Sequence, residues 1–260
     1  MFALSVCLGD LDADVKVALD RARDLEFSAV DIPAAQGPIS PGELSRTGRR
    51  HLLKHLADLG LRLGSLRGPV GGSGYGDARL GEQRLETMRG VMRLAADLKV
   101  PVVSTAPGQA AGEPDQSRLC EALSVLADDA DRTGVVVAIE SAGLGLEALR
   151  KVLREINCHS LAACCDSGAM LMQGEDPPRV ADALPGRIQL VRARDAVPGS
   201  PEAPGYEVTM GEGTLDVPRF LAALAEAGFG GDIVMSRTTG ANRSGDLALA
   251  RAVFLKQLHA

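Results

Sequence analysis

The amino-acid sequence predicts an α/β protein built as one (β/α)8 barrel, the TIM-barrel architecture with a parallel eight-stranded core. Its 260 residues are a typical length for a single barrel of this kind. Eight short apolar runs alternate with longer segments of helical periodicity, which is the pattern of repeated strand–helix units. No change in composition marks a boundary, so we expect one domain over residues 1–260.

The eight candidate strands are short and almost continuously apolar, and each ends at a polar or turn residue. Strands of this kind suit a parallel sheet that is buried on both faces. An open, doubly wound sheet would use similar strands, but the eightfold alternation and the helix at the end of the chain favour a closed barrel. The candidates are Leu4–Leu8, Ala29–Pro33, Leu61–Leu66, Val100–Thr105, Val135–Glu140, Leu161–Asp166, Ile188–Ala193 and Asp232–Ser236.

The segments between these runs carry signals for the starts and ends of helices. Ser40–Glu43 has the sequence of a capping box with proline at the first helical position, and Asp216 is a candidate N-cap for the following apolar segment. An amphipathic helix from about Leu247 to Leu258 closes the chain. Three glycines indicate helix ends just before a strand: Gly60, Gly134 and Gly228.

The composition excludes several classes of protein. Lys and Arg number 28 against 34 Asp and Glu, so the net charge of −6 does not favour a nucleic-acid surface, which needs clustered positive charge. No apolar run approaches the length that spans a membrane, and the first ten residues lack the basic start of a signal peptide. Five cysteines without a CxxC pair indicate reduced, buried thiols. We therefore expect a cytoplasmic protein without nucleic-acid or membrane partners.

Three Gly- and Pro-rich segments follow strand ends, so in a barrel they lie on the C-terminal rim, where ligands bind. Tyr75 and Tyr206 lie in two of them and are either ring-stacking residues for a ligand or ordinary exposed loop tyrosines. Asp31, at the end of the second strand, is either a base on the rim or, as we favour, a cap for the loop that follows. The three segments are Gly68–Gly76, Ala106–Pro114 and Val197–Gly213.

Several motifs occur together in the order and spacing of one known family. Leu94–Val103 has the pattern of a helix end followed by a strand, and Pro107-Gly108 comes directly after it. Val135–Glu140 is a strand that ends in glutamate, and Ala162–Gly168 is similar to a strand that ends in Asp-Thr-Gly-His. Gly211–Asp216 is similar to the segment before the last strand. These segments span nearly the whole chain. On their evidence the chain resembles the sugar phosphate isomerase/epimerase family, the xylose isomerase-like TIM barrels.

The resemblance implies a divalent metal, Mn²⁺, Mg²⁺ or Zn²⁺, bound by Glu, Asp, His and Glu at the ends of strands five to eight. Glu140 and Asp166 match two of these ligand positions, but Arg192 occupies the place of the histidine and Ser236 the place of the last glutamate. Two carboxylates alone bind such a metal poorly. We therefore expect a degenerate metal site and no required cofactor, with Glu140 and Asp166 as the ligands if a metal binds.

Four arginines at strand ends suggest what replaces the metal: Arg67, Arg192, Arg194 and Arg237. Guanidinium groups bind phosphate or carboxylate through paired hydrogen bonds, so these residues could form an anion site. They could equally form an internal cluster that only neutralises the orphaned carboxylates. The sequence leaves both alternatives open, and in either we expect Glu140 and Asp166 to pair with Arg192.

The resemblance implies a protein that acts on or binds a sugar, sugar phosphate or sugar acid in the C-terminal mouth of the barrel. In an active isomerase or epimerase, Glu140 would be the base and Asp166 its partner. The substrate-binding candidates are Arg67, Arg192, Arg237 and Ser236. The alternative is a catalytically inactive pseudoenzyme with a binding or regulatory role. Endonuclease relatives of the fold use many histidines, and the four here are misplaced for that role. The sequence also leaves a homodimer open.

Overall fold

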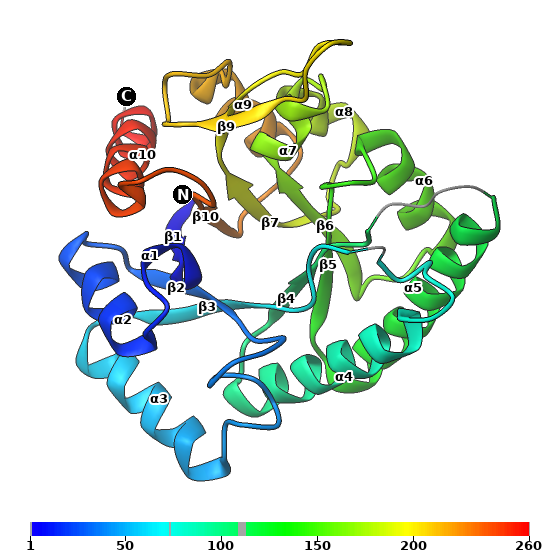
Figure 1. Ribbon diagram of the computed structural model, residues 1–260, viewed down its shortest axis with the longest axis horizontal. Coiled ribbons are helices and arrows are strands. Elements are labelled where there is room, and N and C mark those ends of the chain that lie inside the picture. Colours follow the sequence, from blue (N-terminus) through cyan, green and yellow to red (C-terminus); the bar gives the residue numbers. More distant parts are fainter. Residues whose placement is uncertain (1, 73, 109–112, 260) are drawn as a thin grey trace.

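In the computed structural model, which describes residues 2–72, 74–108 and 113–259, eight parallel strands close into a barrel (Figure 1). Around the barrel the strands follow the order β1, β10, β7, β6, β5, β4, β3 and β2. The predicted TIM barrel is therefore confirmed. The strands are β1 (Ala3–Cys7), β2 (Ala29–Pro33), β3 (Arg62–Arg67), β4 (Val102–Thr105), β5 (Val136–Glu140), β6 (Leu161–Asp166), β7 (Ile188–Ala193) and β10 (Asp232–Met235).

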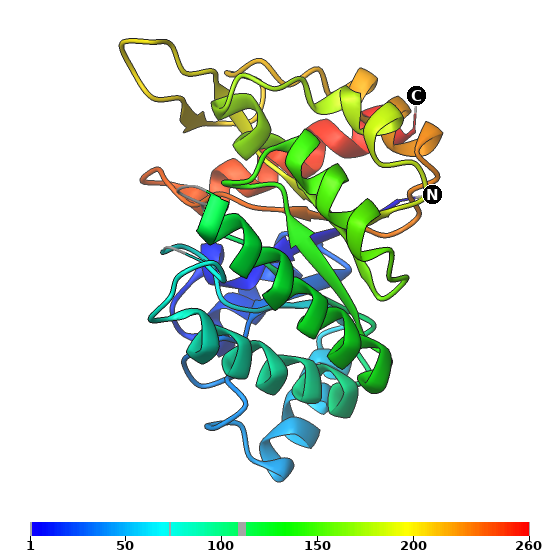
Figure 2. The same ribbon diagram turned by 90° about the vertical axis from the view of Figure 1, so that its right-hand side faces the viewer.

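Helices follow the strands and form the outer ring of the barrel, with α4, α5 and α6 packed side by side along one flank (Figure 2). Buried side chains between strands and helices form the main hydrophobic core, as expected for parallel strands with apolar residues on both faces. The helices are α1 (Leu8–Leu11), α2 (Val15–Asp24), α3 (Arg46–Asp58), α4 (Gly81–Leu98), α5 (Glu113–Thr133), α6 (Leu146–Ile156), α7 (Ser167–Met172), η1 (Pro177–Arg179), α8 (Val180–Ala183), α9 (Val217–Glu226) and α10 (Arg243–Leu258).

Most of the predicted helix boundaries agree with the structure, but two helix starts differ: the one predicted at Ser40–Glu43, and that of α10, which begins at Arg243 and not at about Leu247. The Asp216 carboxylate accepts a hydrogen bond from the backbone N–H of Arg219 and caps α9 as predicted. Ser40–Glu43 forms a turn instead of a helix start, and α3 begins later, behind Ser45, whose hydroxyl accepts from the N–H of Gly48. Ser40 and Ser45 are both serines that could cap a helix, but only Ser45 is followed by a continuous helix. The three glycines after α3, α5 and α9 have positive φ, as helix ends require: Gly60, Gly134 and Gly228.

The interior of the barrel contains a second, smaller apolar cluster of mostly short side chains. Short residues in this layer leave volume for a long side chain, and Arg192 from β7 is the largest fully buried side chain of the described residues. Cys164 belongs to this inner cluster and Cys165 to the outer core, as strand alternation predicts. The inner cluster is Cys7, Ala138, Cys164, Leu190 and Val234.

A short hairpin, β8 (Asp195–Val197) and β9 (Tyr206–Val208), follows β7 and forms a separate two-stranded sheet. The loop between its strands extends beyond the rest of the molecule on the side of the mouth (Figure 2). Asp195 fixes the base of this segment, because its carboxylate accepts backbone N–H groups from Gly211, Gly213 and Leu215. Within the described residues, no helix has the length and apolar character needed to cross a membrane.

Candidate functional site

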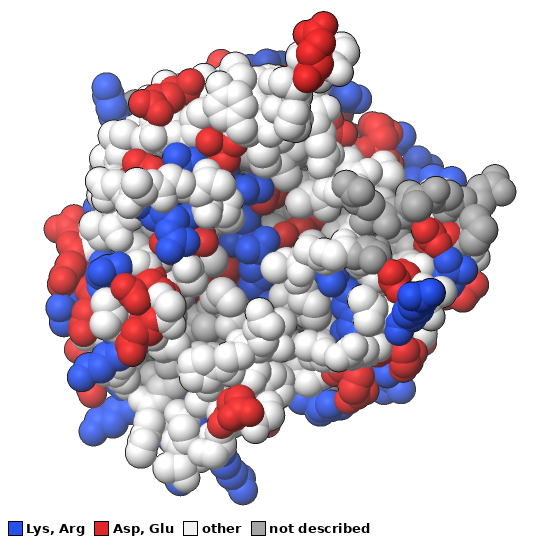
Figure 3. Space-filling view, in the orientation of Figure 1, with Lys and Arg blue, Asp and Glu red and all other residues white. Residues whose placement is uncertain are grey.

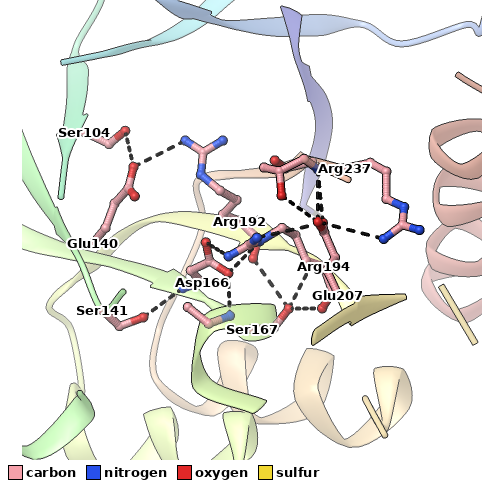
Figure 4. A network of polar contacts seen from close by, with 12 residues as sticks. Ser104, Glu140, Ser141, Asp166, Ser167, Arg192, Arg194, Glu207 and Arg237 are labelled. Carbon is pink, nitrogen blue, oxygen red and sulfur yellow. Dashed lines mark hydrogen bonds and ion pairs between the residues drawn. The ribbon is translucent and has the colours of Figure 1, made fainter. Parts of the chain in front are cut away.

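Glu140 lies at the end of β5, fully buried on the floor of the mouth, and forms a two-fold hydrogen-bonded pair with Arg67 from the end of β3. The Arg67 Nε and Nη2 atoms each lie 2.7 Å from one carboxylate oxygen. Ser104 on β4 donates a third, longer bond of 3.4 Å to the same carboxylate (Figure 4). This paired geometry is the strongest that arginine makes with a carboxylate, so Glu140 is held firmly in its charged form.

Arg192 extends from β7 into the barrel interior, where it has no exposed surface. Its two terminal nitrogens both lie 3.2 Å from one oxygen of Asp31, and Nη2 lies 3.7 Å from Glu140. The other Asp31 oxygen accepts a 2.6 Å bond from the Ser65 hydroxyl. Asp31 is thus part of a buried ion pair, and our prediction that it caps the loop after β2 was wrong. Arg192 thus links the Asp31 carboxylate of β2 with the Glu140 carboxylate at the end of β5.

Asp166, at the end of β6, has both carboxylate oxygens engaged. Arg194 Nε lies 3.0 Å from one oxygen and Arg194 Nη2 lies 2.8 Å from the other. The first oxygen also accepts the N–H of Ala169 and caps α7. Ser167 fixes the backbone of Arg194, because its hydroxyl accepts from the Arg194 backbone N–H and donates to the Arg194 backbone carbonyl (Figure 4). Asp166 therefore pairs with Arg194 and not, as we expected, with Arg192.

The ion pairs set the charge state of these groups. Burial opposes ionisation of Glu140, but the attraction of Arg67, followed by that of Arg192, outweighs it and lowers the pKa of Glu140 to about 2. Burial likewise works against the charged form of Arg192, yet Asp31 and Glu140 raise its pKa well above the ordinary value. Glu140 is therefore a carboxylate, and Arg192 a cation, at any physiological pH.

Ser236 and Arg237, directly after β10, contact a residue from the other end of the chain. The Ser236 hydroxyl and the Arg237 backbone N–H donate to the same oxygen of Asp10, at 2.6 and 2.9 Å. The Arg237 side chain turns away to Asp246 on α10, with Nε 2.8 Å from the carboxylate. Asp10 is buried, and no described residue donates to its second oxygen. Asp10 comes from α1, immediately after β1.

A cleft of about 540 Å³ opens in the mouth on the side of β1, β2 and β3. Charged side chains gather in the hollow at the middle of this face (Figure 3). Arg67 reaches the cleft with 16% of its side chain exposed, and no described residue accepts from its Nη1 atom. The lining is Cys7, Gly9, Asp10, Pro33, Ala35, Gln36, Arg67, Gly68, Pro69, Val70, Gly72, Gly74, Leu80, Gln83, Arg84 and Thr87.

The model of the xylose isomerase-like TIM barrel family matches residues 19–257 of the chain. The chain belongs to this family. Comparison with curated proteins gives no match. The family assignment agrees with the resemblance in the strand-end motifs, and the matched residues include the four ligand positions Glu140, Asp166, Arg192 and Ser236.

Several solved structures share the fold of this xylose isomerase-like barrel at low sequence identity. A xylose isomerase domain protein from Planctomyces limnophilus is 19% identical, with a TM-score of 0.85, 98% of this chain covered and 96% of that one. An L-ribulose 3-epimerase is 17% identical, with a TM-score of 0.80 and coverages of 100% and 95%. D-allulose 3-epimerase from a Methylomonas species, in complex with D-allulose, is 16% identical, with a TM-score of 0.77 and coverages of 98% and 96%.

The divalent metal that the resemblance implies does not fit the residues of this xylose isomerase-like barrel. Glu140 and Asp166 each already accept two short bonds from a guanidinium group. Arg192 stays protonated and cannot become a ligand, and the Ser236 hydroxyl is bonded to Asp10. Among the residues that the structure describes, no group of three or more His, Cys, Asp or Glu side chains is arranged to bind a metal.

The structure also changes the view of residues outside the ligand positions. Tyr75 is buried, with its hydroxyl 2.8 Å from that of Thr105, so it is not an exposed ring for a ligand. Tyr206 on the hairpin is 59% exposed. Sequence reasoning missed Asp10 and Glu207. The position of Asp10 directly after the first strand was the one available signal, and no local pattern marks Glu207. Within the predicted rim segments, Ser73 and residues 109–112 lie outside the described residues.

Proposed function

We propose that the chain binds a sugar or an anionic sugar derivative in the mouth cleft without catalysing a metal-dependent isomerisation. The observation that carries this proposal is the double pairing of Glu140 with Arg67 and of Asp166 with Arg194. Both carboxylates at the ligand positions that the family resemblance marks are occupied by arginine. A glutamate with a pKa of about 2 is also a poor base at neutral pH.

The cleft offers a donor and an acceptor for hydroxyl groups. Arg67 Nη1 is the donor, and the second oxygen of Asp10 is the acceptor. Gln36, Gln83 and Thr87 add neutral polar groups along the lining. A hydroxyl group both donates and accepts, so adjacent sugar hydroxyls can bind Asp10 and Arg67 at once.

Apolar residues complete the lining, which suits the carbon-bound hydrogens of a sugar ring. They are Pro33, Pro69, Val70 and Leu80, of which Val70 and Leu80 are strongly exposed. The volume of about 540 Å³ falls within the usual range for small-ligand sites. The arginine pair with Glu140 fixes the Arg67 guanidinium, so binding loses little side-chain freedom there.

Calorimetric titration of the wild type and of Asp10→Asn with a neutral ketose, an aldonic acid and a sugar phosphate tests the proposal. At least one compound should bind saturably, and Asp10→Asn should weaken that binding by about tenfold or more, because a bond to a charged group is lost. Asp58→Asn, on the exposed end of α3, is the matched control and should bind like the wild type.

Equal affinities in Asp10→Asn and the control, or no binding of any of the three classes, would refute sugar binding in this cleft. The second part of the proposal has its own readout. Incubation of the wild type with each sugar and Mn²⁺, followed by chromatography, should return the starting sugar alone. Formation of an isomer or epimer would show instead that the chain is an active enzyme.

A further inference from the structure

Glu207 on β9 reaches away from its hairpin to the loop that follows β10. Its carboxylate accepts the backbone N–H groups of Thr238 and Thr239, at 3.1 to 3.2 Å. It also accepts both threonine hydroxyls, at 2.6 and 3.1 Å. Four donors from two successive residues thus converge on one side chain that is only 3% exposed. Glu207 has no part in the Arg67–Glu140 and Arg192–Asp31 pairs at the floor of the mouth.

Two guanidinium groups face the same carboxylate from the ends of β7 and β10 (Figure 4). Arg194 Nη1 and Arg237 Nη1 each lie 3.8 Å from one of the Glu207 oxygens. This distance gives attraction between the charges but is too long for a hydrogen bond. Asp166 and Asp246 fix the two arginines through other nitrogens. Arg237 Nη1 donates to the Thr239 hydroxyl at 3.3 Å, whereas Arg194 Nη1 has no described acceptor at hydrogen-bond distance.

We call Arg194, Arg237, Thr238 and Thr239 the anion nest. We propose that the anion nest is a binding site for a phosphate group, and that Glu207 is an internal occupant with which the phosphate exchanges. Phosphate presents three terminal oxygens and up to two negative charges, so it can engage the backbone N–H groups, the hydroxyls and both guanidinium groups together. In TIM barrels the loops after the seventh and eighth strands are a frequent place for phosphate, and the anion nest lies there.

The hairpin allows Glu207 to leave without opening the barrel. β9 pairs only with β8, through Tyr206, Glu207 and Val208, and neither strand joins the barrel sheet. The base of the segment stays fixed, because Asp195 still accepts the N–H groups that follow the hairpin. Exchange therefore breaks the Glu207 contacts and leaves the barrel sheet intact. An incoming phosphate must replace them, which lowers its apparent affinity for the wild type.

Titration with inorganic phosphate tests the exchange directly, and it does not depend on sugar binding. Glu207→Ala vacates the anion nest and should bind phosphate at least about tenfold more tightly than the wild type, because no internal competitor remains. Adding Thr238→Val, which removes one hydroxyl at nearly constant shape, should cancel most of that gain. Glu202→Ala removes the same charge from the exposed tip of the same hairpin and should match the wild type. Acetate should bind Glu207→Ala more weakly than phosphate does.

A purely structural role of Glu207 as a hairpin latch makes the opposite prediction. Glu207→Ala would then lose stability without gaining phosphate affinity, and that result overturns the proposal. Should circular dichroism show that Glu207→Ala is unfolded, Glu207→Gln carries the test, since the neutral amide competes less and should also bind phosphate more tightly. In the wild type, saturating phosphate should speed amide hydrogen exchange in Tyr206–Val208. Unchanged exchange at saturation would equally contradict the proposal.

Discussion

The two sides of the barrel mouth use the same residue types in opposite ways. At the ends of β5, β6 and β7, each carboxylate is matched by an arginine, and Glu140, Asp166 and Arg192 have almost no exposed surface. At the ends of β1 and β3, Asp10 keeps one carboxylate oxygen and Arg67 one nitrogen without a described partner, and both line a cleft.

The difference shows that a charged residue at a barrel strand end is not by itself a functional residue. Its role depends on whether its hydrogen-bonding atoms are already used by neighbours. Glu140 and Asp166 occupy the positions that the family resemblance marks, yet their oxygens are taken. Asp10 matches no family motif, and it presents an open oxygen to the cleft.

The largest effect is expected from Arg192→Met, on the closed side. It leaves the buried carboxylates of Asp31 and Glu140 without their shared cation and should lower the free energy of unfolding by about 3–5 kcal/mol. Asp10→Asn, on the open side, keeps its shape and loses no cation, so about 1 kcal/mol is expected. Urea denaturation measures both. Arg93→Met removes an arginine from an exposed pair and is the control, and a similar loss in Arg93→Met and Arg192→Met would refute the contrast.

The next effect concerns pH and Glu140. Its pKa falls from 4.5 to about 2 on folding, so its pairing stabilises the folded state fully above 4.5 and is lost as the pH falls toward 2. Glu140→Gln should therefore be less stable than the wild type by about 3 kcal/mol at neutral pH, and the gap should close on acidification. Urea titrations across that range measure the gap. A stability difference between the wild type and Glu140→Gln that stays constant down to pH 2 would show that charge attraction to the arginines does not hold Glu140.

A smaller effect is expected from rebuilding the metal site on the closed side. Calorimetric titration with Mn²⁺, Mg²⁺ and Zn²⁺ should show only weak binding to the wild type. Arg192→His, combined with Ser236→Glu, restores the missing donors and should bind at least one of the ions about tenfold more tightly. Tight binding to the wild type that disappears in Glu140→Ala would show that the arginines do not prevent coordination.

The barrel was predictable from the sequence because each of its strands corresponds to a short, continuous run of apolar residues. β2, β6 and β7 have the predicted bounds, and the others differ by one or two residues at one or both ends. The hydrophobic pattern of a segment is a local property, so it can be recognised without knowing which other segments pack against it in the fold. The turn at Ser40–Glu43 was mistaken for a helix start. A capping motif shows where a helix can begin, but it does not show whether the following residues continue the helix.

The partners within the site were not predictable in the same way. The positions of Glu140 and Asp166 follow from their strands, but the choice between Arg67, Arg192 and Arg194 depends on side-chain reach across the barrel. β7 ends at Ala193, so Arg194 stands on the rim over Asp166 whereas Arg192 points inward. The Glu207 contact joins segments that only the folded hairpin brings together, and no local pattern encodes it.

The interlocking of Arg192 with two carboxylates also constrains how the mouth can change over evolutionary time. Replacing only the arginine, or only a carboxylate, leaves a buried charge uncompensated. The effects of substitutions at Asp31, Glu140 and Arg192 on the free energy of unfolding are therefore non-additive. A histidine at position 192 is harmful while both carboxylates remain without a metal, and it becomes acceptable once a metal neutralises them. A path between this mouth and a metal-binding one therefore passes through variants of low stability, unless two residues change together or stability is first gained elsewhere.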